Sequence, residues 1–449
     1  MRRQLRTIVL FLLTGLSVKA QSNREKIDGL LNAYVAIHQF NGSALIIQDG
    51  KKVYEKSLGY QNAAIKSHIT SNSVFPIGSL TKPFTALLIL KLAEENKLSI
   101  NDPVGKYIPG YPRGNDIQIK HLLTHTAGLY DPFGNPKYLD AINTAHVFRP
   151  EEKMAFFKDE PLNFEPGSKF SYSNSGYDLL GIIIEKVTGL SYATALKRYI
   201  FGPLKMRHSG FNFQELKDKN KVTGYSYISS AKQVETKFWN RTLTYASGAL
   251  YSTTDDLFNF YKGLRDFKIV SAKTFEQATT PHLSGYGYGW FIDTIYKDRV
   301  IDHGGNVAGA TSYFLMMPEH KTCIILLNNI TSTSLERIGN SMYAALQNKP
   351  YRVPQPKKEI EIAEQILQKY TGIYIVSETY KVEIIKEGNK LFMKVNSGNK
   401  IKLCAERKGV FFISDEDMTL EFISKDNEII ELKIKQGLGT KVADKIRHT

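Results

Sequence analysis

Cysteine is almost absent from this sequence, and several other signals of function are missing as well. Only Cys323 and Cys404 occur in 449 residues, which argues against a disulfide scaffold and a cysteine-ligated zinc or iron–sulfur site. Beyond the N-terminal segment, no apolar run approaches the roughly 18 residues of a membrane span. No strip of basic and aromatic residues indicates nucleic-acid binding. No complete Gly-x-Ser-x-Gly motif marks an α/β-hydrolase nucleophile.

The composition is that of a globular protein. Hydrophobic residues make up 42% and charged residues 23% of the chain. At roughly 100–200 residues per domain, the length predicts two or three domains, each able to bury a core. The net charge of +15 is carried mainly by scattered lysines, which we interpret as solvated surface that could favour an anionic cell envelope.

Residues 1–20 have the pattern of a secretory signal peptide. They begin with Arg2 and Arg3, continue with an apolar run from Ile8 to Val18, and end in a small residue, Ala20. Cleavage after Ala20 predicts an exported protein, periplasmic or secreted, without a stable membrane span. The alternative is an uncleaved anchor, for which the apolar run is short.

Residues 21–347 alternate between strand-like and helix-like stretches. Strands at both ends with helices between them predict an α/β domain whose sheet is completed by its own C-terminal part. The predicted strands are Ser43–Gln48, Lys52–Glu55, Thr311–Met317 and Thr322–Leu327, and the predicted helices are Ser79–Lys97, Tyr177–Val187 and Tyr192–Tyr199.

A second domain follows a linker. Residues 348–359 contain three prolines among basic residues, which is typical of a stiff, exposed connection. After a short helix at Ile360–Tyr370, period-two patterns predict a small all-β barrel or sandwich over residues 360–449. Its predicted strands are Tyr380–Ile385, Leu391–Val395, Lys400–Cys404, Val410–Ser414, Leu420–Ser424 and Ile429–Lys435.

Ser79 and Lys82 form the first candidate for chemistry. Three residues apart on a helix, they share one face, and the helix N-terminus favours negative charge on the hydroxyl. A buried lysine loses its proton more easily and can serve as a base. The same tetrad occurs at Ser229–Lys232 and Ser397–Lys400, but only Ser79 precedes an apolar helical run.

Two more clusters could contribute to the same site. Tyr172 and Asn174 stand just before a predicted helix, where a phenol and an amide can face one cleft; a neighbouring lysine would lower the pKa of the phenol. The other reading is a polar turn that caps the helix. The run Asp302–Asn306 precedes a predicted strand, and its paired glycines allow close approach of a ligand. Its other reading is a tight turn with a surface histidine.

Together, these clusters resemble the serine β-lactamase and penicillin-binding-protein family, especially its class C and D,D-peptidase branch. The ordered signature of that family is Ser-x-x-Lys, Tyr-x-Asn and Lys/His-x-Gly. Similar segments are Ile119–Leu129, Ala246–Thr253 and Tyr286–Trp290. The resemblance covers roughly residues 25–345 and implies a β-lactamase/transpeptidase-like domain, an antiparallel sheet with flanking helices plus a helical region, followed by a lipocalin-like β-domain.

The resemblance also implies a role for each matched residue. Ser79 would be the acyl-forming nucleophile, Lys82 its base, and Tyr172 the proton shuttle that also activates the deacylating water. No metal or organic cofactor is implied. Asn174 would hold the substrate, His303 would complete the proton network, and Gly304, Gly305 and Asn306 would line the substrate site, with the amides of Ser79 and Asn306 forming an oxyanion hole.

Other readings of the sequence remain open. His121 and His125 have the spacing of a helical zinc pair, but Leu122 stands where a zinc protease needs glutamate. The β-domain could bind a ligand or partner, or could stabilise the hydrolase domain. A member of the family fold without catalysis would be a penicillin- or ligand-binding protein.

The third motif bears on the substrate. His303 replaces the lysine of many relatives, and an unperturbed imidazole is mostly neutral at about pH 7. We therefore expect weak selection for a free carboxylate, and we expect acidification toward pH 6 to improve binding of carboxylate-bearing substrates. D-amino-acid peptides of the peptidoglycan type are the leading substrates, followed by carboxylic esters and then β-lactams.

Overall fold

The computed structural model describes residues 23–229, 232–332, 335–377, 380–396, 398–414, 418–436 and 439–446. The predicted signal peptide and Ser397 lie outside these residues. The chain divides into two compact units, one formed by residues 41–339 and the other by the residues up to 40 together with those from 340 onward. The predicted domain boundaries at 347 and 359 stay predictions.

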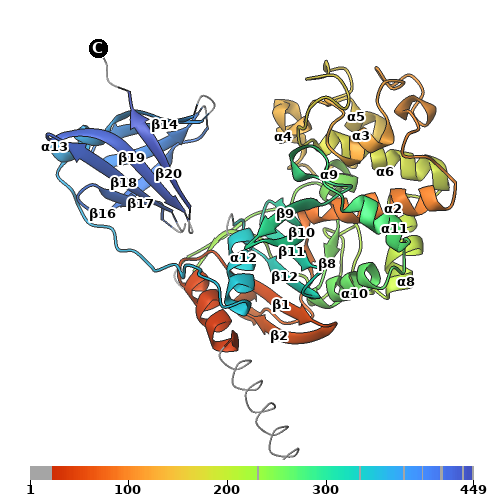
Figure 1. Cartoon of the computed structure of the whole chain (residues 1–449), viewed down its shortest axis with the longest axis horizontal. Helices are drawn as coiled ribbons and strands as arrows, with labels where there is room; N and C mark the ends of the chain where they lie inside the picture. Colours follow the sequence, from red (N-terminus) through yellow and green to blue (C-terminus); the bar gives the residue numbers. More distant parts are fainter. Residues whose placement is uncertain are drawn as a thin grey trace, which may run out of the picture. The chain divides into compact units, whose positions relative to one another are not determined.

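The larger unit is built on a six-stranded antiparallel sheet with the strand order β2-β1-β12-β11-β10-β9. Its inner strands β11 and β12 are buried along their whole length, which explains their nearly continuous apolar sequences. Figure 1 shows the red strands β1 and β2 beside β12, so both ends of the unit meet in one sheet. The strands are β1 (Gly42–Gln48), β2 (Lys51–Ser57), β9 (Phe291–Ile295), β10 (Asp298–Val307), β11 (Ala310–Met317) and β12 (Thr322–Asn328).

A helical region is inserted between β2 and β9 and carries Ser79, Lys82, Tyr172 and Asn174. Helix α2 packs against α6 and α9, while α10 packs against β1 and β12. The α-helices are α2 (Thr81–Glu94), α3 (Ile119–Leu123), α4 (Pro136–Ala141), α5 (Pro150–Met154), α6 (Asn174–Thr188), α7 (Tyr192–Leu196), α8 (Gly202–Leu204), α9 (Arg241–Gly248), α10 (Thr254–Arg265), α11 (Ala272–Ala278) and α12 (Leu335–Leu346).

Short elements complete this part of the chain. Residues 23–36 are also helical. The short strands pair as β3 (Tyr60–Asn62) with β4 (Ser67–His68), β5 (Phe75–Pro76) with β8 (Tyr251–Ser252), and β6 (Tyr225–Ile228) with β7 (Gln233–Glu235). The tight turns are η1 (Gly78–Leu80), η2 (Val104–Lys106), η3 (Pro132–Gly134), the π-helical η4 (Lys197–Phe201) and η5 (Leu283–Gly285).

The predicted α/β fold class is confirmed, with two local corrections. The expected helix Ser79–Lys97 is divided into the turn η1 and helix α2, because the chain turns at Gly78 with a positive φ of 53° before it becomes α-helical. The run Asp302–Asn306 precedes the predicted strand, now β11, but is itself part of strand β10 and not a turn. Glycine is needed at position 305 because another segment of backbone packs closely against it.

The smaller unit contains the predicted all-β barrel, and the structure confirms it as a closed antiparallel barrel. The prediction missed its first and last strands. Its core is filled by side chains that include Tyr370, Tyr374, Phe411 and Phe422. The strands are β13 (Gly372–Ser377), β14 (Tyr380–Glu387), β15 (Lys390–Val395), β16 (Ile401–Arg407), β17 (Val410–Phe412), β18 (Met418–Lys425), β19 (Glu428–Gln436) and β20 (Gly439–Lys445), preceded by α13 (Glu364–Leu367) and η6 (Gln368–Tyr370).

Within the described part of the chain, no single helix is long and apolar enough to cross a membrane. One bent pair, α6 with residues 192–204, meets the length and composition test together, with an angle of 76° between its halves.

Candidate active site

Ser79 lies in the turn η1. Contacts with the sheet hold this turn in place. The hydroxyl of Ser312 on β11 donates to the carbonyl oxygen of Ile77 at 2.7 Å. Gly78 adopts a positive φ of 53°, and a Cβ atom there would lie 2.7 Å from the backbone nitrogen of Asn306. Only glycine therefore allows this turn to pack so closely against β10.

Lys82 lies one turn after Ser79 and is completely buried. Its Nζ donates to Ser79 Oγ at 3.1 Å, to Asn174 Oδ1 at 2.8 Å and to the carbonyl oxygen of Ser247 at 2.8 Å. An ammonium has three N–H donors, so these acceptors use all of them. When the amine is neutral, its lone pair can instead accept the proton of the Ser79 hydroxyl.

Burial brings the pKa of Lys82 close to neutrality. Loss of water around the ammonium lowers this pKa from 10.5 to about 7, even though Asp178 and Asp131 raise it. The Lys153 ammonium lowers it further. A substantial fraction of Lys82 is therefore an uncharged amine at neutral pH, as a general base beside Ser79 requires.

Asn174, the first residue of α6, is oriented by Asp131. One carboxylate oxygen of Asp131 accepts from the backbone nitrogen of Asn174 at 2.7 Å and from its Nδ2 at 3.0 Å. These contacts turn Asn174 Oδ1 toward Lys82. The oxygen and the nitrogen of the Asn174 carboxamide are thus both hydrogen-bonded within the protein. The predicted contact of Asn174 with substrate stays a prediction.

We expect Asp131→Asn to lower kcat/KM roughly tenfold, because charge-assisted hydrogen bonds that orient Asn174 are lost. Removal of this carboxylate also removes a charge that raises the pKa of Lys82. The pH at half-maximal rate should therefore fall below that of the unmodified protein, which a pH–rate profile would detect.

Asp140→Asn is the matched control, since Asp140 is exposed on α4. An unchanged kcat/KM in Asp131→Asn would contradict the positioning role of Asp131, and an unchanged pH midpoint would contradict its effect on the pKa of Lys82.

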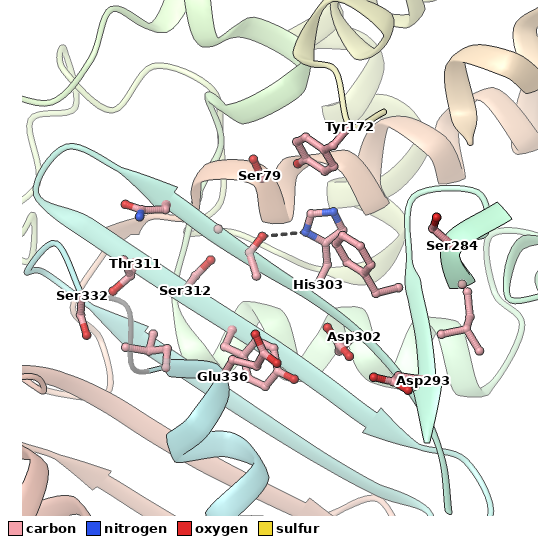
Figure 2. A pocket seen from close by; sticks show the side chains of 18 residues that line it. Ser79, Tyr172, Ser284, Asp293, Asp302, His303, Thr311, Ser312, Ser332 and Glu336 are labelled. Atoms are coloured by element: carbon pink, nitrogen blue, oxygen red, sulfur yellow. Dashed lines mark hydrogen bonds between the residues drawn. The ribbon is translucent and has the colours of Figure 1, made fainter. Parts of the chain in front are cut away.

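Tyr172 faces Ser79 across the site (Figure 2). Its ring centroid lies 4.7 Å from Lys82 Nζ. The prediction that the lysine lowers the pKa of this phenol is wrong: burial raises the pKa of Tyr172 above its usual range, although a hydrogen bond with Ser79 opposes the shift. The physical reason is that a phenolate would lose its water here. Tyr172 therefore rests as a proton donor.

His303 is buried in β10 rather than exposed on a turn. Its Nδ1 lies 2.6 Å from the carbonyl oxygen of Gly304 and must donate to it. Its Nε2 therefore accepts from the hydroxyl of Tyr286 at 3.0 Å. Burial, with a further contribution from Lys82, lowers the pKa of His303 to about 3. The ring stays neutral at pH 6, so the predicted gain in carboxylate binding through His303 is wrong.

The two glycines after His303 lie in the same strand, and they have different neighbours. A Cβ atom on Gly305 would lie 1.8 Å from the carbonyl oxygen of Ile77. Gly304 has only ordinary contacts and lines the cavity together with Asn306. Gly305 therefore lets the backbone of β10 approach the Ser79 turn, whereas the contacts of Gly304 do not require glycine.

A cavity of about 800 Å³ opens in front of this machinery (Figure 2). Ser79, Tyr172 and His303 line it, while Lys82 and Asn174 lie behind its wall. Three carboxyl groups line the side away from Tyr172: Asp293, Asp302 and Glu336. Burial raises the pKa of Asp302 to about 8, and the two neighbouring carboxylates add to the shift. Of the described residues, no lysine or arginine lines the cavity.

His125, which the sequence reading left as structural, lies directly against Tyr172. The ring centroids are 4.2 Å apart, and His125 Nδ1 accepts from the backbone nitrogen of Ser173 at 3.1 Å. His121 instead accepts from the backbone nitrogen of Gln118 within α3. The signal that could have identified His125 was its place in the family-like segment Ile119–Leu129.

A buried ion pair lies behind Lys82 and was missed by the sequence reading. Lys153 Nζ and Asp178 Oδ1 are 2.8 Å apart, with side chains 2% and 0% exposed. Asp178 lies one helical turn after Asn174 on α6, and so on the same face. Burial raises the pKa of Asp178 to about 6 and lowers that of Lys153 to about 8, while the pairing opposes both shifts.

The second Ser-x-x-Lys tetrad is not part of the site. Ser229 follows β6, and its hydroxyl contacts the backbone of Lys232 rather than the amine. The Lys232 amine lies over the ring of Tyr227 instead.

The chain is similar in sequence to proteins that are already known. Residues 27–349 match the family model described as Beta-lactamase. A penicillin-binding protein of Bacillus subtilis (strain 168) is 30% identical over 432 residues, which cover 90% of this chain and 94% of the relative.

Solved structures agree with this match. The octameric penicillin-binding protein homologue from Pyrococcus abyssi superposes with a TM-score of 0.67 and 30% identity, covering 93% of this chain and 99% of the other. The D-amino acid amidase from Ochrobactrum anthropi SV3 has the same fold, with a TM-score of 0.66 and 22% identity over 73% of this chain and 99% of the other.

Proposed function

Because the chain belongs to the β-lactamase family of serine hydrolases, we propose that it hydrolyses amide bonds of D-amino-acid compounds through an acyl-enzyme on Ser79. The observation that carries this proposal is the 3.1 Å contact between Ser79 Oγ and a lysine whose pKa is about 7. The nucleophile and a partly neutral base are thus already within reach of each other.

Acylation then follows from the positions of the groups. Neutral Lys82 accepts the proton of Ser79 while Oγ attacks the substrate carbonyl carbon. The backbone amides of Ser79 and Asn306 are the proposed donors to the resulting oxyanion, where one donor contributes about 2.7–4 kcal/mol. Tyr172, a protonated phenol, gives its proton to the leaving nitrogen and is reprotonated from Lys82. The amine departs, and the acyl group stays on Ser79.

Deacylation repeats the sequence with water as the nucleophile. Neutral Lys82 accepts a proton from the water as it attacks the ester carbonyl carbon, either directly or through Tyr172, which passes its own phenol proton to Lys82 as it takes one from the water. Ser79 Oγ takes this proton back from Lys82 when the acid leaves. The buried, neutral His303 fixes the hydroxyl of Tyr286 beside the site and does not itself need to change charge.

The charge of the cavity favours one substrate class. Its wall carries Asp293 and Glu336, and no lysine or arginine among the described residues. Asp302 also lines it but, with a pKa of about 8, is mostly uncharged at neutral pH. A free carboxylate on the substrate would meet like charge there, whereas an amine or a neutral group would not. We therefore favour an amidase or D-aminopeptidase activity over a D-alanyl-D-alanine carboxypeptidase, with peptidoglycan fragments as the proposed source of such substrates.

Carboxylic ester hydrolysis is the second candidate. His303 in the third motif is neutral and therefore provides no positive charge to bind a substrate carboxylate. A neutral ester has no carboxylate and does not need such a charge. The same observation places β-lactams, which carry a carboxylate, third.

Rates on matched substrates test the proposed class. We expect kcat/KM for D-alanine p-nitroanilide to exceed that for its L isomer by at least about tenfold. An acylated peptide ending in D-alanyl-D-alanine should be hydrolysed more slowly, because its carboxylate faces the acidic wall. Equal rates on both isomers, together with fast release of D-alanine from the peptide, would contradict the proposal.

The pH dependence of acylation tests the base. The reactive form of Lys82 is the amine, so the rate should rise with pH through about 7 and then level off. Neither His303, with a pKa of about 3, nor Tyr172, whose pKa is raised above its usual range, titrates in this window. The measurement is the acylation rate of an activated ester between pH 5 and pH 9.

Asp302 lines the cavity and also titrates in this window, with a pKa of about 8. The buried pair Asp178 and Lys153, with pKa values of about 6 and 8, titrates there too but does not line the cavity. Asp302→Asn is therefore the control, and we expect the midpoint to persist in it. Loss of the midpoint in that variant would assign the profile to Asp302 instead of Lys82.

We further propose export through the N-terminal segment, on the basis of the sequence pattern alone. N-terminal sequencing of protein recovered from the culture medium or periplasm should begin near Gln21.

A further inference from the structure

A second cavity, of about 840 Å³, lies in the larger unit between η4, α8, the start of α9 and β8. It shares no lining residue with the cavity at Ser79. Its volume is close to that of the catalytic cavity and is in the range of small-molecule sites.

The lining of this cavity is strongly basic. Lys197, Lys205, Arg207 and Arg241 line it, and no Asp or Glu among the described residues does. Arg241 pairs with exposed Glu215 at 2.6 Å. No ion pair involves the other three cations within the described ranges. Four positive charges around one hollow raise the local potential for an anion.

The cavity also has an apolar floor. Phe201 and Met206 line it and are 5% and 2% exposed. The ring of Tyr251 extends beside Gly210, where a Cβ atom would lie 2.5 Å from the tyrosine oxygen. Burial raises the pKa of Tyr251, so its hydroxyl stays protonated and can donate a hydrogen bond. The combination suits a ligand with one anionic end and a short apolar part.

The backbone around the cavity departs from regular α-helical geometry at Lys197–Phe201 and at Lys205. Residues Lys197–Phe201 form a π-helical turn, a feature often found at functional sites. Lys205 adopts a left-handed conformation with φ of 57°, which is uncommon for a residue other than glycine. The turn is held by a hydrogen bond from the backbone nitrogen of Met206 to the carbonyl oxygen of Phe201 at 2.8 Å.

We propose that this cavity binds an anionic ligand that carries a phosphate or carboxylate group on a short apolar portion. The cations would pair with the anionic group, and arginine offers it the planar, bidentate donor geometry that phosphate and carboxylate accept. The apolar portion would lie on Phe201 and Met206. The site is separate from hydrolysis, so it does not depend on the proposed reaction.

Helix α9 connects this cavity with the catalytic lysine. Arg241, at its start, lines the cavity, and Ser247, near its end, accepts a hydrogen bond from Lys82 at 2.8 Å. The helix is interrupted at Tyr245, whose φ of 29° and ψ of −127° are not helical. A ligand bound to Arg241 therefore contacts α9, the helix whose Ser247 carbonyl oxygen holds Lys82 in place. Lys82 is the group that accepts the proton of Ser79.

The test uses the full mature chain and two anionic probes, hexyl phosphate in solution and phosphatidylglycerol vesicles, with phosphatidylcholine vesicles as the neutral reference. Titration calorimetry or vesicle co-sedimentation should show binding of at least one anionic probe that weakens with salt. In the double variant Lys197→Gln with Arg207→Gln, affinity should fall about tenfold or more. Binding of hexyl phosphate would indicate a soluble ligand, and binding of vesicles alone would indicate a lipid headgroup.

The control is Lys268→Gln with Lys273→Gln, two exposed lysines away from the cavity, which changes the net charge equally. We expect the control to bind as the unmodified protein does. Equal loss in both double variants, or no binding of either anionic probe, would overturn the proposal. Circular dichroism and ester hydrolysis would show that each variant is folded.

Discussion

Replacing Ser79 by alanine is expected to abolish covalent turnover and to lower the hydrolysis rate by roughly 10⁴–10⁶-fold. The hydroxyl that receives the acyl group is then missing, while the cavity and Lys82 remain. Intact mass should show an adduct on the unmodified protein after incubation with an activated ester or a penicillin, and none on Ser79→Ala. A persistent penicillin adduct would mark a penicillin-binding peptidase, and a rapidly cleared one a β-lactamase.

Ser229→Ala is a matched control, because Ser229 has the same spacing to a lysine but lies in the β6–β7 connection. That variant should acquire the same adduct as the unmodified protein. An adduct that persists in Ser79→Ala would place the nucleophile elsewhere. Absence of both adduct and product with the unmodified protein would favour a binding-only member of the fold.

The second large effect is expected on stability, from Asp178→Asn. This change leaves the Lys153 ammonium buried without its 2.8 Å partner, and breaking a buried ion pair in this way costs about 3–5 kcal/mol. Urea unfolding monitored by fluorescence should therefore show a lower midpoint with an unchanged slope.

The double variant Asp178→Leu with Lys153→Met provides the comparison. Burial raises the pKa of Asp178 and lowers that of Lys153, so for each group the folded state disfavours the charged form. The pKa of Asp178 is higher in the folded protein than in the unfolded chain, so the protonated form of Asp178 stabilises the fold. This contribution to the free energy of unfolding is complete below about pH 4 and is lost as the pH rises through about 6. An apolar pair of similar size should then cost little or nothing. If the double variant is as unstable as Asp178→Asn, the pair itself provides the stability.

Much of the fold could be predicted because strands and helices leave periodic patterns. The sheet strands β1, β11 and β12 were predicted to within one residue at each end, since each is a compact apolar run. The barrel strands β13 and β20 were missed. Neither has a clear period-two pattern: β13 is a short apolar run directly after the predicted helix, and β20 is mostly polar. Each is a strand because it pairs with its sequence neighbour, β14 or β19.

Some residues of the site could be predicted from sequence motifs, and others could not. Ser79, Lys82 and Tyr172 belong to motifs with fixed spacing, and the structure brings them together. Asp131 belongs to none of these motifs, because it reaches the site from the loop before η3. Asp178 follows Asn174 by one helical turn on α6, but only the structure shows that it is buried beside Lys153. The protonation states also required the structure. The pKa of a side chain depends on its burial, on neighbouring charges and on its hydrogen bonds, and a sequence states none of these.

The pairing of β1 with β12 has a consequence for how the chain folds. Gly42 pairs with Asn328, and Ile47 pairs with Cys323, so β1 gains its second neighbour in the sheet only after nearly the whole unit has been synthesised. Contacts between such distant residues slow folding and leave apolar strands exposed in the meantime. Until β12 arrives, one edge of the apolar β1 is available to other chains. We therefore expect the nascent protein to depend on chaperones more than its final stability would indicate.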